Sequence, residues 1–217
     1  MGLPYMDEMK KRWEKLNSDT LHPVPVVLLA PSWGRSGLLS RFGEKIIDAI
    51  LDTGYHLIIR PHPQSFASEK DLMSRLQDKY PASARVEWNR DRDNFDVLSR
   101  ADILVSDFSG VLFDFALVFD KPVIYTDTEF DNGPYDAWWL EEELWEFSIL
   151  SSLGEKLDGE NLPRIKELID RCLKDNKYAE GRNRARGETW CHQGEGAKRV
   201  ADYLQALYER RRMKAEG

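Results

Sequence analysis

The sequence predicts an α/β fold in which a doubly wound parallel sheet forms a single Rossmann-like domain. Two observations lead to this prediction. Short apolar runs bounded by turn residues alternate along the chain with segments whose apolar residues recur at helical spacing. Five such runs separated by helices favour parallel strands, because parallel strands need helical crossovers. With 217 residues, 41% of them hydrophobic, the chain can build a substantial core.

The elements are expected in a regular order. A leading helix over 5–17 carries apolar residues on one face, and the continuous apolar run 24–30 suits a strand covered on both faces. A helix over 38–52 is expected to end at Gly54. The remaining strands are expected at 55–60, 85–88, 102–106 and 122–126, and the remaining helices at 69–80, 94–100, 109–119, 162–174 and 195–211.

The acidic, aromatic segment 130–157 breaks this alternation, and we expect a loop and a helix packed near the strand ends. Trp138, Trp139, Trp145 and Phe147 lie in it. Burial against the sheet or a missing domain is the favoured interpretation of these aromatics, and a contact surface is the alternative. No linker or repeat is visible, so one domain is the simplest count.

Composition excludes several classes of protein. A net charge of −7 argues against nucleic acid as a partner, and no apolar run is long enough for a membrane span, which predicts a cytoplasmic location. Cys172 and Cys191 lack the spacing of a metal clip or disulfide framework and are interpreted as structural. No metal-ligating residues and no cofactor are expected. The basic run 210–214 is interpreted as a solvated helix end, with peripheral membrane contact as the alternative.

In open α/β sheets, ligands bind beyond the carboxyl ends of the strands, so ligand-binding residues are expected in the loops that follow strands. The first of these loops, PSWGRSG over 31–37, has two glycines that allow close backbone approach and one arginine, Arg35, suited to phosphate. An ordinary surface turn explains the same residues more simply.

The second loop is RPHP, in which Pro61 and Pro63 restrict the backbone around His62. A rigidly held imidazole after a strand is well placed to donate to an oxygen anion. The alternative is a histidine bonded to neighbouring carbonyl groups.

The third loop carries the strongest signal. The apolar strand ends in Ser106 and Asp107, and Ser109 and Gly110 then open a helix, so a hydroxyl and free N–H groups converge on one spot. A plain helix cap is the competing interpretation. Asp114, within the otherwise apolar helix, is expected to be structural.

These motifs resemble the C-terminal half of the CDP-glycerol glycerophosphotransferase family, the teichoic-acid polymerases and primases. The resemblance rests on LLAPSW, IIRPHP and ILVSDFSGVLFDFALVFDKPVIYTD in that order, and GLPYMDEM at the start is similar to the segment that joins the two halves of those enzymes. It covers nearly the whole chain.

The resemblance implies a GT-B architecture of which this chain is the donor-nucleotide half, with 1–20 as leading helix and interdomain segment and 21–217 as the Rossmann-like domain. The family's acceptor half supplies a histidine thought to act as base, so this chain is expected to bind CDP-glycerol but hardly to transfer it alone. The implied acceptor is a polyol-phosphate or glycan of a cell-wall or capsular polymer.

Carried over by motif, the resemblance implies that His62 meets the donor pyrophosphate as the catalytic residue, that Ser109 and the adjoining backbone hold its phosphates, and that Asp107 orients the turn. Relatives commonly have a second serine where this chain has Gly110, and a threonine where it has Ser32. The full expected binding set is Ser32, Arg35, Arg60, His62, Ser106, Asp107, Ser109 and Gly110.

Two other functions stay open at this point. One keeps the fold and changes the donor, giving a nucleotide-sugar glycosyltransferase or an epimerase-like domain. The other is a noncatalytic module that recognises polymer or a partner protein through the aromatic residues.

Overall fold

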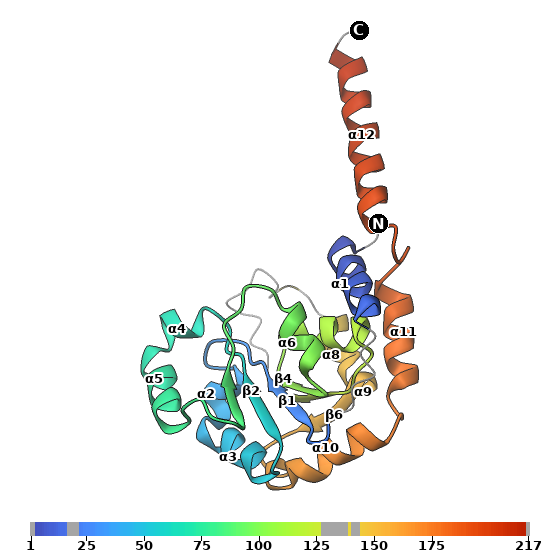
Figure 1. Cartoon of the computed structure of the whole chain (residues 1–217). Coiled ribbons are helices and arrows are strands. Elements are labelled where there is room, and N and C mark those ends of the chain that lie inside the picture. The colour runs from blue at the N-terminus through green and yellow to red at the C-terminus, as the bar shows by residue number, and fades with distance from the viewer. Residues whose placement is uncertain (1–2, 17–21, 127–138, 140–143, 216–217) are drawn as a thin grey trace.

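A six-stranded, wholly parallel sheet forms the centre of the computed structural model, which describes residues 3–16, 22–126, 139 and 144–215 (Figure 1). The strand order is β3-β2-β1-β4-β5-β6. The chain runs outward from β1 in one direction and then restarts at β4 in the other, so the switch point lies between β1 and β4. The predicted doubly wound parallel sheet is confirmed.

The strands are short and mostly buried. They are β1 (Val26–Leu29), β2 (His56–Ile59), β3 (Val86–Trp88), β4 (Ile103–Ser106), β5 (Val123–Thr126) and β6 (Gly154–Leu157). In β4 every residue is buried, which explains the continuous apolar pattern of that run. The five predicted strands are therefore confirmed, and β6 is a sixth.

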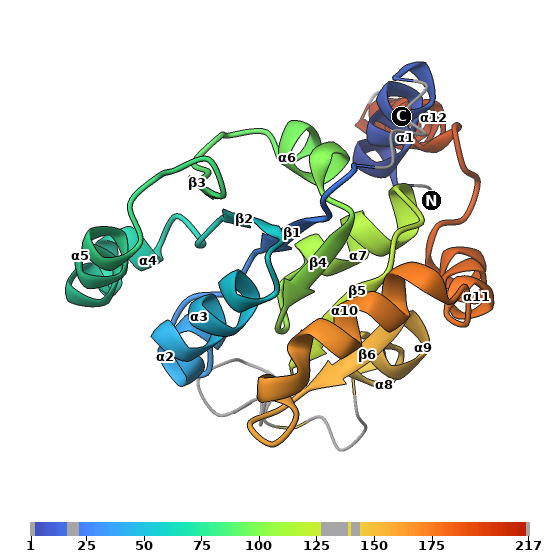
Figure 2. The ribbon, with the colours of Figure 1, turned by 60° about the horizontal axis from the view of Figure 1, so that its bottom comes forward.

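Helices cover both faces of the sheet (Figure 2). They are α1 (Pro4–Lys15), α2 (Leu38–Phe42), α3 (Glu44–Asp52), α4 (Ser65–Ser68), α5 (Lys70–Lys79), α6 (Phe95–Arg100), α7 (Val111–Phe113), the π-helical turn η1 (Asp114–Val118), α8 (Trp145–Ser148), α9 (Leu150–Leu153), the 3₁₀ turn η2 (Leu162–Arg164), α10 (Ile165–Lys174), α11 (Ala179–Thr189) and α12 (Gly196–Ala215).

The alternation of side chains along each strand divides the core into two layers. Val27 and Leu29 of β1 face α2, α3, α5 and α10, whereas Leu28 between them faces α1, α6, α7, η1, α9 and α11. Each layer is a continuous apolar cluster, and the sheet separates them.

Several elements differ from the sequence-based expectation. The predicted helix 38–52 is broken into α2 and α3 at Gly43, whose φ of 53° is a left-handed value that favours glycine. The predicted helix 109–119 becomes α7 followed by η1. Strand β6 and helix α11 were not expected, because β6 reads GEKL and α11 reads AEGRNRARGET, with little apolar periodicity.

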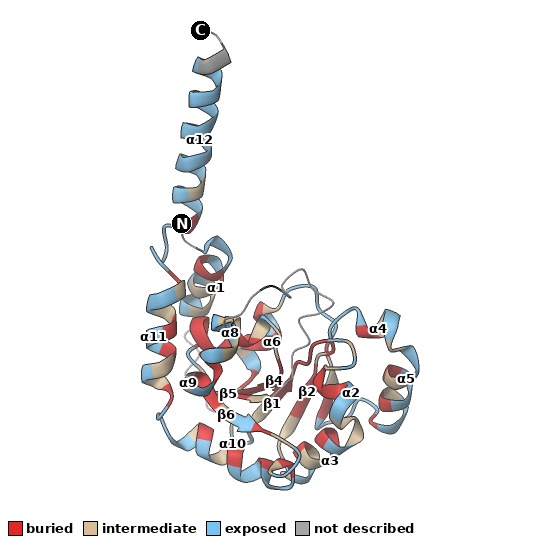
Figure 3. Cartoon of the chain, turned by 180° about the vertical axis from the view of Figure 1, so that it is seen from behind, coloured by how far each residue is buried: buried red, intermediate tan, exposed pale blue. Residues whose placement is uncertain are grey.

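Helix α12 projects away from the rest of the fold, beginning beside α1 (Figure 1). The buried carboxylate of Asp7 in α1 holds this junction, because it accepts hydrogen bonds from Trp190 Nε1 at 2.8 Å and from the N–H groups of Gly194 at 2.7 Å and Gly196 at 2.8 Å. Beyond this junction, α12 is exposed from Ala201 to Met213 (Figure 3).

Candidate functional site

The carboxyl ends of β1, β2 and β4 bring three loops to one edge of the sheet, at the switch point. A pocket of about 520 Å³ lies among these loops and the loop that follows β3. Its lining comprises Ala30, Pro31, Arg60, Pro61, His62, Pro63, Arg90, Asp91, Arg92, Asn94, Ser109 and Val111.

A buried carboxylate braces two of these loops against each other. Asp107, which follows β4, has no exposed surface and accepts hydrogen bonds from the N–H of Ser32 at 3.0 Å and the N–H of Leu38 at 2.8 Å. Burial raises the pKa of Asp107, although hydrogen bonds from Ser32, Leu38 and Ser109 act in the opposite direction. The residue therefore fixes the shape of the turn, as the sequence analysis expected.

Ser106 strengthens the same brace. Its hydroxyl donates to the carbonyl oxygen of Ala30 at 2.6 Å, and the side chain is fully buried. The loops after β1 and β4 are thus held together by Ser106, Ser32 and Asp107. None of these three residues lines the pocket. Their geometry assigns them to supporting the site.

His62 lines the pocket as an exposed side chain. Its Nδ1 accepts a hydrogen bond from the N–H of Gln64 at 3.1 Å, so in the neutral imidazole the proton resides on Nε2. The ring of Trp33, from the β1 loop, lies 6.3 Å from the imidazole centroid to centroid. His62 is therefore held by backbone on one side and presents a donor on the other.

Ser109 reaches the same pocket from the start of the α7 helical segment. The N–H groups of Leu112 and Phe113 turn back to the carbonyls of Ser109 and Gly110, at 3.0 Å and 3.1 Å. Within the described residues, the N–H groups of Gly110 and Val111 have no hydrogen-bond partner. These donors, with the Ser109 hydroxyl and His62, suit an anion.

The remaining expected site residues are placed differently. Arg35 is exposed on the β1 loop and does not line the pocket, and Gly110 is exposed at the start of the helical segment. Arg60 lines the pocket, but its guanidinium is bonded to Asn89, to the carbonyl of Asp91 at 2.7 Å and to Asn94 at 2.7 Å.

The loop over 89–94 lines the pocket, although none of its residues was among the expected binding residues. It contributes Arg90, Asp91, Arg92 and Asn94 to the pocket lining. The signal that was available is its position directly after a predicted strand, since every such loop in a parallel sheet reaches the same edge.

A larger pocket of about 910 Å³ lies at the opposite, amino edge of the strands. Two of its lysines already have partners. Lys121 donates to the carbonyls of Ser99 and Ala101, and Lys166 pairs with Asp170 at 3.0 Å. Burial lowers the pKa of Lys121 to about 8. The carboxyl-edge pocket is the better anion site because the N–H groups of Gly110 and Val111 have no partner among the described residues and lie beside His62 and Ser109.

Other expected features have mixed outcomes. Trp139 is 60% exposed and Trp145 37% exposed, so burial against the sheet is not observed for them, while Trp138 lies outside the described residues. Cys172 is buried, with its pKa raised to about 11 by desolvation, whereas Cys191 is exposed.

No described helix combines the length and apolar character needed to cross a membrane.

Comparison with solved structures shows the fold. The wall teichoic acid polymerase TagF superposes with a TM-score of 0.52 at 18% identity, over 96% of this chain and 48% of that one. The UDP-GlcNAc 2-epimerase of Methanocaldococcus jannaschii, solved with UDP-GlcNAc and UDP, gives 0.57 at 14% identity, over 94% of this chain and 54% of that one. The chain thus shares the fold of about half of each of these proteins.

Sequence comparison identifies the family. The teichoic acid glycerol-phosphate primase of Bacillus subtilis (strain 168) is 28% identical over 133 residues, which is 58% of this chain and 32% of the primase. The match therefore covers about a third of the primase, as the superpositions cover about half of each solved structure. The model of the CDP-Glycerol:Poly(glycerophosphate) glycerophosphotransferase family matches residues 2–205. Since that match covers almost the entire sequence, the chain belongs to the CDP-glycerol glycerophosphotransferase family.

Proposed function

We propose that residues 21–217 form the donor-nucleotide domain of a CDP-alcohol glycerophosphotransferase, with 1–20 as the segment leading from an acceptor half. The observation that carries the proposal is the convergence of His62 and Ser109, from loops after β2 and β4, on one pocket at the switch point. The family match favours CDP-glycerol as the donor, and a TagF structure obtained by a CDPG soak agrees with this choice.

In the proposed reaction, an acceptor hydroxyl attacks the β-phosphorus of CDP-glycerol, its proton passes to a base, and cytidine monophosphate leaves. The Nε2–H of His62, the Ser109 hydroxyl and the N–H groups of Gly110 and Val111 stabilise the negative charge on the phosphates. Because the family's attacking base belongs to the acceptor half, this chain by itself binds donor and positions it.

Calorimetric titration of the folded chain with CDP-glycerol tests this proposal. We expect saturable binding, about a tenfold weaker affinity in His62→Gln, and a smaller loss in Ser109→Ala, as for removal of single hydrogen bonds to a charged group. His56→Gln is the matched control, because His56 begins β2 at the opposite edge of the sheet. Absence of binding at millimolar CDP-glycerol would rule the function out.

A second candidate changes only the nucleotide. The superposition on the epimerase favours a uridine nucleotide-sugar as the ligand, and this argument rests on the shared fold alone. Competition separates the two: the proposal requires CDP to displace a bound nucleotide better than UDP, and the reverse order would favour the nucleotide-sugar function.

A further inference from the structure

The loop over 89–94, NRDRDN, joins β3 to α6 and forms one wall of the pocket. Three arginines line that pocket, namely Arg60, Arg90 and Arg92, but they are not equivalent. Their partners decide which of them has donors available for a ligand.

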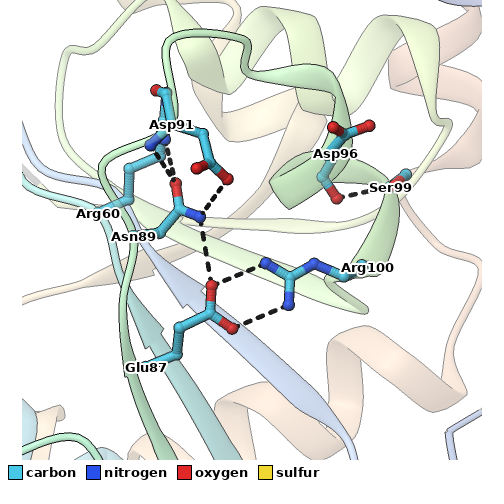
Figure 4. Close-up of polar contacts among 7 residues, drawn as sticks. All are labelled: Arg60, Glu87, Asn89, Asp91, Asp96, Ser99 and Arg100. Atoms are coloured by element: carbon cyan, nitrogen blue, oxygen red, sulfur yellow. Dashed lines mark hydrogen bonds and ion pairs between the residues drawn. The ribbon is translucent and has the colours of Figure 1, made fainter.

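Arg60 is engaged with the loop itself. Its guanidinium donates to Asn89 Oδ1 and to the carbonyl of Asp91 (Figure 4). It also donates to Asn94 Oδ1, so one cation contacts both ends of the loop. Burial lowers the pKa of Arg60. A guanidinium has five N–H donors in a fixed planar arrangement, and in Arg60 several of them are bonded to other groups of the protein.

Asn89 extends this contact to the sheet. Its side chain is 5% exposed, and its Nδ2 donates to Glu87 at 3.2 Å and to Asp91 at 2.8 Å. Glu87 in turn accepts two hydrogen bonds from Arg100, at 2.8 Å and 2.7 Å (Figure 4). These side-chain contacts run from Arg100 through Glu87 and Asn89 to Arg60, and we call them the relay. The relay therefore ties the loop to β3 and α6.

Helix α1 holds the other side of the loop. Arg12 pairs with Asp93 at 2.5 Å and lies over the ring of Phe95 at 3.9 Å, while Asp93 accepts the N–H of Phe95 at 2.9 Å. Asp93, on one side of Arg92, is thus paired with a cation that does not line the pocket.

Arg90 is also occupied. Its guanidinium carbon lies 3.7 Å from the centroid of the Phe66 ring, and it donates to Gln77 Oε1 at 3.2 Å. Arg92, by contrast, is exposed, lines the pocket, and has no hydrogen bond or ion pair within the part of the chain that the structure describes. Its complete fork of donors faces an anion site.

We propose that Arg92 binds the phosphates of the donor directly, and that Arg60 acts as a positioning residue that holds loop 89–94 so that Arg92 faces His62 and Ser109. This inference rests on the proposed function, because the nucleoside diphosphate is the ligand of the same pocket. It assigns the cation of the site to a loop after β3, on the far side of β2 from the switch point.

Titration with CDP and with cytidine tests the role of Arg92. In Arg92→Gln, the dissociation constant for CDP rises about tenfold and that for cytidine is unchanged, because only CDP carries phosphate. Added salt weakens CDP binding less in the variant than in the wild type. Arg210→Gln, the same charge change on exposed α12, leaves both constants unchanged.

Equal CDP affinity in Arg92→Gln and wild type overturns the inference while leaving the proposed function intact. If the wild type binds neither CDP nor CDP-glycerol, the proposed function itself has failed. An equal loss of affinity for CDP and cytidine also overturns the inference, since it indicates a general disturbance of the pocket.

The positioning role is tested by a double-mutant cycle with Asn89→Ala. The single variant weakens CDP binding, and combining it with Arg92→Gln adds little further loss, because Asn89 acts through Arg92. Additive losses overturn the relay. Glu87→Gln repeats the cycle with an isosteric side chain in case Asn89→Ala fails to fold, which thermal unfolding monitors.

Discussion

Asp114 is a carboxyl group placed in an apolar environment, at the first position of the π-helical turn η1. Burial raises its pKa to about 6, with no hydrogen bond to a described residue opposing the effect. Among the described residues, the carboxylate forms no hydrogen bond to a neighbouring loop. π-helical turns are frequent at functional sites, and this one directly follows the loop of Ser109.

We expect the free energy of unfolding to depend on Asp114 in a defined pH window. Because the folded pKa of about 6 exceeds the ordinary value of 3.8, the native state binds this proton more tightly, so stability falls as the pH rises from about 4 to about 6. Asp114→Asn should therefore gain up to about 3 kcal/mol above pH 6 and nothing near pH 4.

Urea unfolding of the variant and the wild type across pH measures this difference. Asp78→Asn, at an exposed position of α5, is the matched control and should show no such window. A gain that is the same at pH 4 and pH 7 would contradict the prediction.

Asp107→Asn should have the opposite effect at all pH values where the protein folds. The carboxylate accepts N–H groups from both the β1 loop and the helix start, and an amide NH₂ in that place meets donors on every side. We expect a loss of about 2 kcal/mol, typical of buried donors left unsatisfied. Thermal unfolding measures it, and unchanged stability would show that the brace is dispensable.

At the residue scale, part of the site was predictable from sequence. His62, Arg60 and Ser109 were found because they follow apolar strands, and the structure brings all three to one pocket. Arg92 was not found, because NRDRDN has the composition of any solvated loop. Its role depends on Arg60 holding the loop through the carbonyl of Asp91 and on Arg12 pairing with Asp93, which only the three-dimensional arrangement reveals.

At the scale of elements, strand β6 shows what apolar patterning overlooks. It is an edge strand that reads GEKL, so it pairs through its backbone and offers few side chains to the core. Gly154 is required there by close approach: a Cβ at this position would lie 1.8 Å from the carbonyl oxygen of Val123 in β5. Strand β6 is therefore recognised from its backbone pairing with β5, because its own sequence has no pattern of apolar residues.

Gly154→Ala should consequently disrupt the pairing of β5 with β6. We expect a loss of about 3 kcal/mol or failure to fold, since the clash is with backbone and cannot be relieved by a rotamer change. Gly159→Ala is the control, because a Cβ there meets nothing within 4 Å and should be close to neutral. Denaturation of both variants gives the comparison, and two equal results would refute the argument.

At the scale of the whole molecule, the doubly wound class followed from sequence because parallel strands and crossover helices alternate regularly. The order of the strands did not follow, since sequence alone does not say on which side of β1 the chain restarts. The projecting helix α12 was expected as a helix, but its lack of contact with the sheet was not, because its apolar residues Tyr203, Leu204, Leu207 and Tyr208 suggest packing.

Because every described side chain of α12 from Tyr203 to Met213 is exposed, truncation after Asp202 should hardly alter the stability of the domain. The Asp7 junction with Gly196 is kept in that variant. We expect the melting temperature to change by about 2 °C or less, and a larger fall would mean that the helix packs against the domain in solution.

The projection of α12 from the rest of the fold also has a hydrodynamic consequence (Figure 1). The 20 residues of α12 extend about 30 Å, comparable to the diameter of a small domain. A particle of this outline experiences more friction than a sphere of 25.2 kDa, so it should sediment slowly for its mass and tumble faster about the helix axis than across it.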